Sequence, residues 1–180
     1  TVMEDNDAVS RLALQHLAAA GCRSVSFVGQ PDYSTAFSQR YFSYLAAASQ
    51  LPVETPDDML IGRPDKEMNE LIAELTQRIG ARETLPDAFY CANDYIAIML
   101  IRALTTQGIS IPEQVSIIGV DNNPVSALVS PQLCSLDIQC EQQAHYALRR
   151  MTELLQDKTS EPVRLLIQPR LIPGASVQHA

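Results

Sequence analysis

Segments with the apolar periodicity of helices alternate with short, unbroken apolar runs along this 180-residue chain, and this alternation constrains the fold most. Unbroken apolar runs are typical of strands buried on both faces of a parallel sheet. The predicted helices cover 6–20, 37–49, 66–79, 95–107 and 141–155, and the predicted strands cover 24–28, 59–61, 88–91, 115–120, 133–136 and 163–167. Residues 173–180 carry no pattern. The sequence therefore predicts an α/β fold, with a parallel sheet flanked by helices on both faces.

Charge narrows the classes of partner. The net charge of −8 and the pI of about 4.8 argue against binding of nucleic acid or of an anionic membrane surface by this chain alone. The first seven residues are acidic and polar, unlike a secretory signal, and no apolar run is long enough to span a membrane. Because Thr1 stands where an initiator Met is expected, we expect further residues upstream.

Residues that could carry chemistry are scattered. The four cysteines form no C-x-x-C pair, and the three histidines lie far apart, so we predict reduced structural thiols, no metal site and no cofactor. Phosphate-binding glycine loops, nucleophile elbows and zinc-protease motifs are all missing from the sequence. These observations argue against an enzyme.

Polar side chains follow three of the predicted strands where each strand ends. They are Asn93-Asp94 after 88–91, Asp121-Asn122-Asn123 after 115–120, and the stretch 32–40, which ends in Arg40. Parallel strands bring their carboxyl ends to one rim, where α/β proteins bind ligands. Amide, carboxylate and guanidinium groups there suit a polyhydroxyl solute.

Each of these residues also has a purely structural interpretation. Asp94 is well placed as the N-cap of the helix 95–107, and we expect it to take that role, which leaves Asn93 to face the solute. Asp121 to Pro124 could be only a turn, and Arg40 could be an ordinary surface residue.

The stretch PDAFYCANDYIAIMLIRALTTQGISIPEQVSIIGVDN, residues 86–122, strongly resembles the effector-binding core of the lactose/galactose-repressor (LacI/GalR) family of bacterial transcription regulators. Looser matches extend the resemblance over roughly residues 2–176: HLAAAGCRSVSFVGQP at 16–31, Arg40, SPQLCSLD at 130–137 and PRLIPGAS at 169–176. The resemblance implies a periplasmic-binding-protein-like type I architecture, with two α/β subdomains joined by crossover strands. The chain would hold the second subdomain plus part of the first.

The resemblance also implies a division of the chain. Residues 1–23 would form a crossover and a helix of the first subdomain, and 24–132 the effector-binding second subdomain. Residues 133–156 would be a return segment of the first subdomain, and 157–180 the re-entry into the second subdomain and the tail.

Effector-binding residues follow by carrying the family's motifs over to this sequence. They are Arg40, Asn93 and Asp121, with Arg63 where the family often has an aromatic ring. An arginine at 63 favours a sugar acid or sugar phosphate over a neutral sugar. Glu4 and Asp5 are alternatives for the family's crossover aspartate.

The implied function is effector sensing in a cytoplasmic, DNA-binding transcription regulator, with a small sugar or sugar derivative as effector. Operator DNA would be bound through a headpiece that this chain lacks, and the regulator would act as a homodimer. Exposed faces of the helices 37–49 and 66–79 are candidates for the dimer contact. The alternative is a solute-binding receptor of a sugar transport system.

Overall fold

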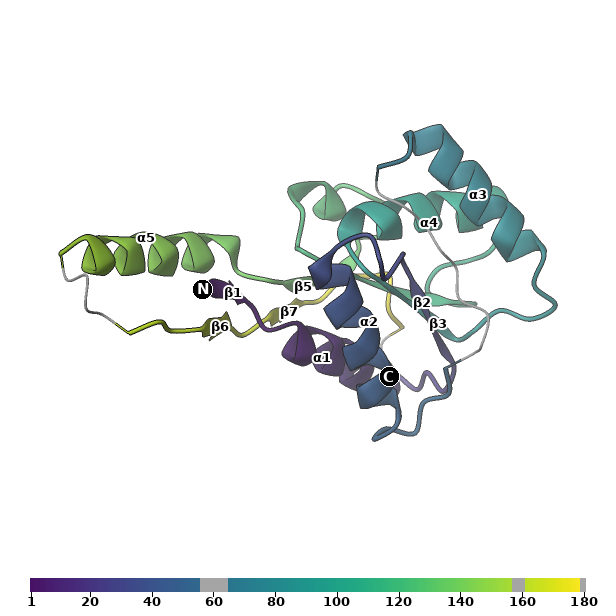
Figure 1. Ribbon diagram of the computed structural model, residues 1–180. Coiled ribbons are helices and arrows are strands. Elements are labelled where there is room, and N and C mark those ends of the chain that lie inside the picture. The colour runs from purple at the N-terminus through teal and green to yellow at the C-terminus, as the bar shows by residue number, and fades with distance from the viewer. Residues whose placement is uncertain (56–64, 157–160, 179–180) are drawn as a thin grey trace.

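The structure is a computed structural model that describes residues 1–55, 65–156 and 161–178. Figure 1 shows two parts, a layered body built around a twisted sheet and a narrow arm that projects from it. The predicted strand at 59–61 and the candidate Arg63 lie outside the described residues.

The body is built on a five-stranded sheet in the order β2-β3-β4-β5-β7. Four of its strands run parallel, and the fifth is antiparallel to β5 at the edge. The strands are β2 (Val25–Val28), β3 (Ala88–Cys91), β4 (Ser116–Val120), β5 (Cys134–Asp137) and β7 (Arg170–Ile172). Every residue of β2, β3 and β4 is buried, as the unbroken apolar runs predict for a sheet covered on both sides.

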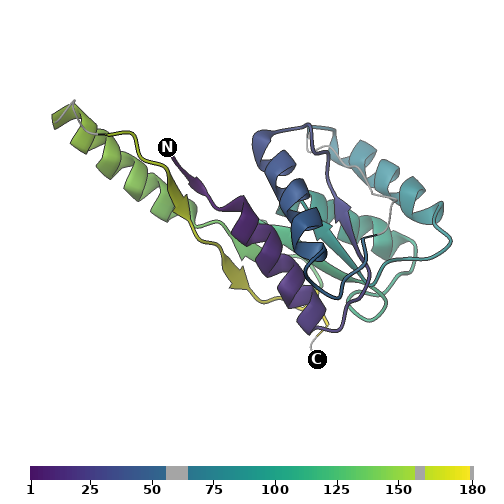
Figure 2. The ribbon, with the colours of Figure 1, turned by 60° about the horizontal axis from the view of Figure 1, so that its bottom comes forward.

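Helices cover both faces of this sheet, as Figure 2 shows. One face carries α1 (Asn6–Ala19) and α2 (Thr35–Ala48), and the other carries α3 (Met68–Gly80) and α4 (Asp94–Thr106). A 3-10 turn, η1 (Pro124–Ala127), follows β4. The predicted α/β class, with its flanked parallel sheet, is confirmed.

The arm consists of three elements from the two ends of the chain. Strand β1 (Val2–Glu4) pairs in parallel with β6 (Leu165–Ile167), and α5 (Cys140–Gln156) packs on β1. No residue of α5 is buried, although the helix is amphipathic. Its large apolar side chains Leu148, Met151 and Leu155 are 55–75% exposed.

Several expectations need correction. We expected residues 1–23 to belong with the first subdomain, yet α1 packs against α2 and contributes to the core of the body. Met68, predicted on the buried side of its helix, is 51% exposed. The C-terminal tail carries no sequence pattern, but its described part is packed in the body, because Ser176 and Val177 are buried. Ser176 Oγ accepts a hydrogen bond from Cys134 N and donates one to Ile117 O, which joins the tail to the sheet.

Candidate functional site

Arg40 lies at the centre of a cluster of polar side chains at the carboxyl ends of the parallel strands. Its guanidinium is 3.4 Å from the carboxylate of Asp121, which follows β4, and 3.6 Å from that of Glu4, which ends β1. Arg40 Nε donates to Asn6 Oδ1 (2.9 Å), and its Nη1 donates to Ala92 O (2.6 Å). The predicted convergence of Arg40 and Asp121 therefore exists, with Glu4 and Asn6 from the N-terminal end of the chain beside it.

The position of Arg40 is fixed from several sides. Its own carbonyl accepts a hydrogen bond from Ser10 Oγ, which also shares a hydrogen bond with Tyr90 OH. Burial raises the pKa of Tyr90 to about 12, so this phenol stays neutral. The side chain of Arg40 is only 4% exposed, and its contacts leave it little freedom to move toward a ligand.

Asp121 is the most solvent-accessible member of the cluster, with a side chain that is 36% exposed. Its backbone has a φ of 107°, in a region that residues with a side chain rarely adopt. Burial raises the pKa of this carboxyl to about 6; the Arg40 guanidinium opposes the shift, and the nearby Asp94 and Glu4 carboxylates add to it. Asp121 therefore changes charge near neutral pH.

The structure gives the role of α4 N-cap to Asn93 and not to Asp94. Asn93 is the N-cap of α4, because its Oδ1 accepts a hydrogen bond from Ile96 N at 3.0 Å. Asp94 is 1% exposed and accepts hydrogen bonds from Asn123 N, Ser126 Oγ and Ser135 Oγ, each at 2.7 Å. The prediction that Asp94 caps the helix was wrong, whereas effector binding by Asn93 stays a prediction.

The two acidic residues near the N-terminus have different contacts in the structure. Glu4 faces Arg40, whereas Asp5 is the N-cap of α1 and accepts from Ala8 N at 3.0 Å. Two further cluster residues were not singled out from the sequence: Asn6, and Gln39, which accepts a hydrogen bond from Asn6 Nδ2. What pointed to this region was the family resemblance, which offered Glu4 or Asp5 as the crossover aspartate.

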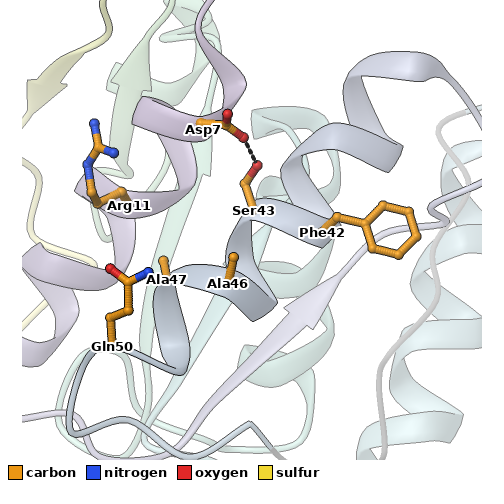
Figure 3. Close-up of a pocket in the computed structure, with 7 residues that line it drawn as sticks. All are labelled: Asp7, Arg11, Phe42, Ser43, Ala46, Ala47 and Gln50. Carbon is orange, nitrogen blue, oxygen red and sulfur yellow. Dashed lines mark hydrogen bonds between the residues drawn. The ribbon is translucent and has the colours of Figure 1, made fainter.

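Several hollows mark the surface of the described residues, and three of them bear on the candidate site or on partner binding. One of about 170 Å³ adjoins the cluster, since Glu4, Asn6 and Gln39 line it. A second, of about 340 Å³, lies between α1 and α2 and is drawn in Figure 3, where Asp7 and Ser43 share a hydrogen bond. The third, of about 770 Å³, is an apolar groove between α3, α4 and the segment 123–130.

Two carboxylates and one guanidinium give the cluster an excess of hydrogen-bond acceptors and one net negative charge when all three are ionised. Such a set can accept hydrogen bonds from hydroxyl groups. Among the described residues, no three His, Cys, Asp or Glu side chains are grouped to hold a metal ion. The chemistry of the cluster is therefore suited to a small polar molecule.

Comparison with known proteins defines the class of protein. The sequence profile of the periplasmic binding protein-like domain matches residues 14–177, and the chain belongs to that family. The chain is 27% identical over 168 residues to the HTH-type transcriptional repressor PurR of Pasteurella multocida (strain Pm70). It is 25% identical over 168 residues to the HTH-type transcriptional regulator CelR of Thermobifida fusca. Each match covers 93% of this chain and 49% of the relative, so the chain spans about half the length of these relatives.

Solved structures agree on the fold. The transcriptional regulator CelR–cellobiose complex superposes with a TM-score of 0.81 at 25% identity, over 96% of this chain and 52% of that one. The Escherichia coli transcriptional repressor AscG superposes with a TM-score of 0.84 at 23% identity, over 99% of this chain and 64% of that one. The resemblance to lactose/galactose-repressor regulators is thereby confirmed.

Proposed function

We propose that the chain is the effector-sensing domain of a bacterial DNA-binding transcription regulator, and that it couples ligand binding to operator affinity. The cluster of Glu4, Arg40 and Asp121 is the observation that carries this proposal, because it joins the arm to the body at the rim where ligands of such folds bind. Relatives named as transcription regulators, matched over 93% of the chain, support it. The second candidate, a receptor of a sugar transport system, shares the same ligand chemistry.

The charges of the cluster favour a neutral polyhydroxyl ligand. Arg40 already contacts two carboxylates, a side-chain amide and a main-chain carbonyl, so it has little donor capacity left for an anion. A sugar acid or sugar phosphate would also meet the charges of Glu4 and Asp121. Sugar hydroxyls, by contrast, can donate to the Asp121 carboxylate. The complex of the CelR relative contains cellobiose, a neutral disaccharide.

The arm is proposed to belong to the first subdomain. An isolated two-stranded sheet is marginally stable in water, and α5 leaves apolar side chains exposed on it. Additional strands and helices from the first subdomain would cover this surface. The ligand would then lie between arm and body, and it would favour one orientation of the two. Such a ligand shifts DNA affinity by its differential affinity for the two orientations, typically about 1–3 kcal/mol.

A homodimer is proposed to form through the apolar groove of about 770 Å³. Met68 and Ile72 of α3, Ile98 and Met99 of α4, and Val125 line it. Of the two helices considered from the sequence, this groove involves 66–79 and not 37–49. Paired domains would place two headpieces on the half-sites of an operator.

The remaining proposals concern class and compartment. The matched relatives are named as transcription regulators and not as enzymes, and we propose that this chain performs no catalysis and needs no cofactor. Among the described residues, no helix has the length and apolar character needed to cross a membrane. We propose a cytoplasmic location, where operator DNA is found.

A thermal-shift panel tests the ligand proposal. Neutral mono- and disaccharides are compared with the matching sugar acids and sugar phosphates, in the wild type, in Asp121→Asn and in Glu113→Gln. A neutral sugar at about 100 times its Kd should raise the Tm by roughly 5–10 °C. Asp121→Asn should abolish most of the shift. Glu113→Gln removes the same single charge from an exposed turn that precedes β4, at the opposite end of this strand from Asp121, and should leave the shift intact.

Two results would contradict the proposal: no stabilisation by any neutral sugar, or a shift that depends on Glu113 and not on Asp121. Operator binding separates the two candidate functions. The DNA affinity of a regulator changes when the same sugar is added, whereas a transport receptor does not bind operator DNA.

A further inference from the structure

The buried carboxylate of Asp94 has three hydrogen-bond donors and no exposed surface of consequence, although it lies next to the rim that carries Asp121. Burial raises the pKa of Asp94, and its bonds from Ser126, Ser135 and Asn123 oppose that shift. All three partners are donors, so the ionised carboxylate satisfies all of them with its two oxygen atoms. Asp94 itself cannot touch a solute at the rim.

Its partners belong to the turn that presents Asp121. The N–H groups of three consecutive residues are held: Asp121 N donates to Leu136 O at 2.8 Å, Asn122 N to Ser135 Oγ at 3.0 Å, and Asn123 N to Asp94 Oδ2 at 2.7 Å. Because Ser135 Oγ donates in turn to Asp94 Oδ1, the carboxylate holds two of these N–H groups, one directly and one through Ser135.

The backbone conformation of this turn requires support from its surroundings. Asp121 and Asn122 have φ values of 107° and 52°, in the left-handed half of the backbone map that side chains disfavour. A conformation of this kind persists only when its surroundings enforce it. Gly119 is part of the arrangement, because a Cβ at that position would lie 2.2 Å from Asp94 Oδ1. β4 thus leaves the space that the carboxylate occupies.

We propose that Asp94 is a positioning residue for ligand recognition: through Ser135 and the Asn123 amide it fixes the turn that places the Asp121 carboxylate beside Arg40. The inference rests on the proposed function, since it assigns Asp94 a role in presenting the ligand-binding Asp121.

Ser135 and Ser126 provide a matched pair of variants. Each serine is buried and donates one hydrogen bond of 2.7 Å to Asp94, but only Ser135 also accepts from a turn N–H, that of Asn122. Ser135→Ala and Ser126→Ala therefore each remove one bond to Asp94, at Oδ1 and Oδ2 respectively, and only Ser135→Ala also removes the acceptor of Asn122 N. Neither change alters the charge near Asp121.

Two NMR measurements on the purified protein test the proposal without any ligand. The first is the amide exchange of Asn122 and Asn123 relative to the amides of β3. The second is the pKa of the Asp121 carboxyl. In Ser135→Ala, exchange should accelerate about five- to tenfold, as expected for losing one hydrogen bond. The pKa should fall from about 6 toward the ordinary value of about 3.9, as Asp121 becomes solvated.

In Ser126→Ala, both quantities should stay at their wild-type values. The proposal is overturned if the two serine variants behave alike, or if Ser135→Ala changes neither quantity. Asp94→Asn provides a third test, in which amide exchange alone is measured. The pKa of Asp121 is not used for this variant, because loss of the Asp94 charge would itself lower that pKa. A protein that binds no sugar would refute the proposed function but leave this test in force.

Discussion

Replacing Asn93 by Ala tests the corrected assignment of the α4 N-cap. The change removes the Oδ1 acceptor of Ile96 N and leaves that N–H beside a side chain with no exposed surface. Loss of an Asn cap costs about 0.5–2 kcal/mol, and the burial of Ile96 places this case in the upper half of that range. A domain of this size loses about 2–4 °C in Tm per kcal/mol, so we expect a decrease of roughly 3–8 °C.

Asn93→Ser is the matched control, because serine caps helices nearly as well as asparagine but has no amide donor for a ligand. Urea denaturation, analysed at a constant m-value, should show that Asn93→Ala loses about 1–2 kcal/mol and Asn93→Ser less than about 0.5 kcal/mol. If both variants are as stable as the wild type, Asn93 is not the cap. If Asn93→Ser is destabilised as much as Asn93→Ala, the loss has a cause other than capping.

Four further outcomes are expected. Affinity for a neutral sugar should fall as the pH drops through about 6, since protonated Asp121 is a poorer acceptor, and the titration profile of Asp121→Asn should be flat. The effect of pH on folding has the opposite sign, because the pKa of Asp121 is higher in the folded state than in the unfolded state. The contribution of Asp121 to stability is therefore full below a pH of about 3.9 and is lost as the pH rises through about 6. Denaturation at several pH values measures this change. Gly174→Ala should lower the free energy of unfolding by about 3 kcal/mol in urea denaturation, since its Cβ would lie 2.4 Å from the Leu133 carbonyl carbon. In the control Gly80→Ala, the nearest neighbour of the Cβ is 3.5 Å away, and stability should change by less than about 1 kcal/mol. Ser176→Ala should cost about 2 kcal/mol by the same assay, because a buried N–H and a buried carbonyl lose their partner.

The layered body could be predicted from the sequence because its signals are local. Unbroken apolar runs marked β2, β3 and β4, and helical periodicity located all five helices to within two residues at each end. The edge strand β7 and the buried Ser176 were missed. Their place is set by pairing with β5 and by contacts to residues more than 40 positions away, which leave no local pattern.

Two members of the candidate site were predictable from the sequence, but its other members and the roles of Asn93 and Asp94 were not. The ends of parallel strands pointed to Arg40 and Asp121, which do converge. Asn93 and Asp94 are adjacent and are both good caps, so the sequence could not decide which one turns inward. That choice depends on Ser126 and Ser135, which approach Asp94 from distant parts of the chain. The same holds for Glu4, which only the course of β1 brings to Arg40.

The account depends most on the claim that the Asp121 carboxylate, presented beside Arg40, binds a small neutral solute. Isothermal titration of the sugar that gives the largest shift in the panel, against the wild type and Asp121→Asn at pH 7.5, tests it most directly. Loss of hydrogen bonds to a charged acceptor is worth about 1.5–3 kcal/mol, so the variant should bind about 10- to 150-fold more weakly. Equal affinity in the two proteins would contradict the claim.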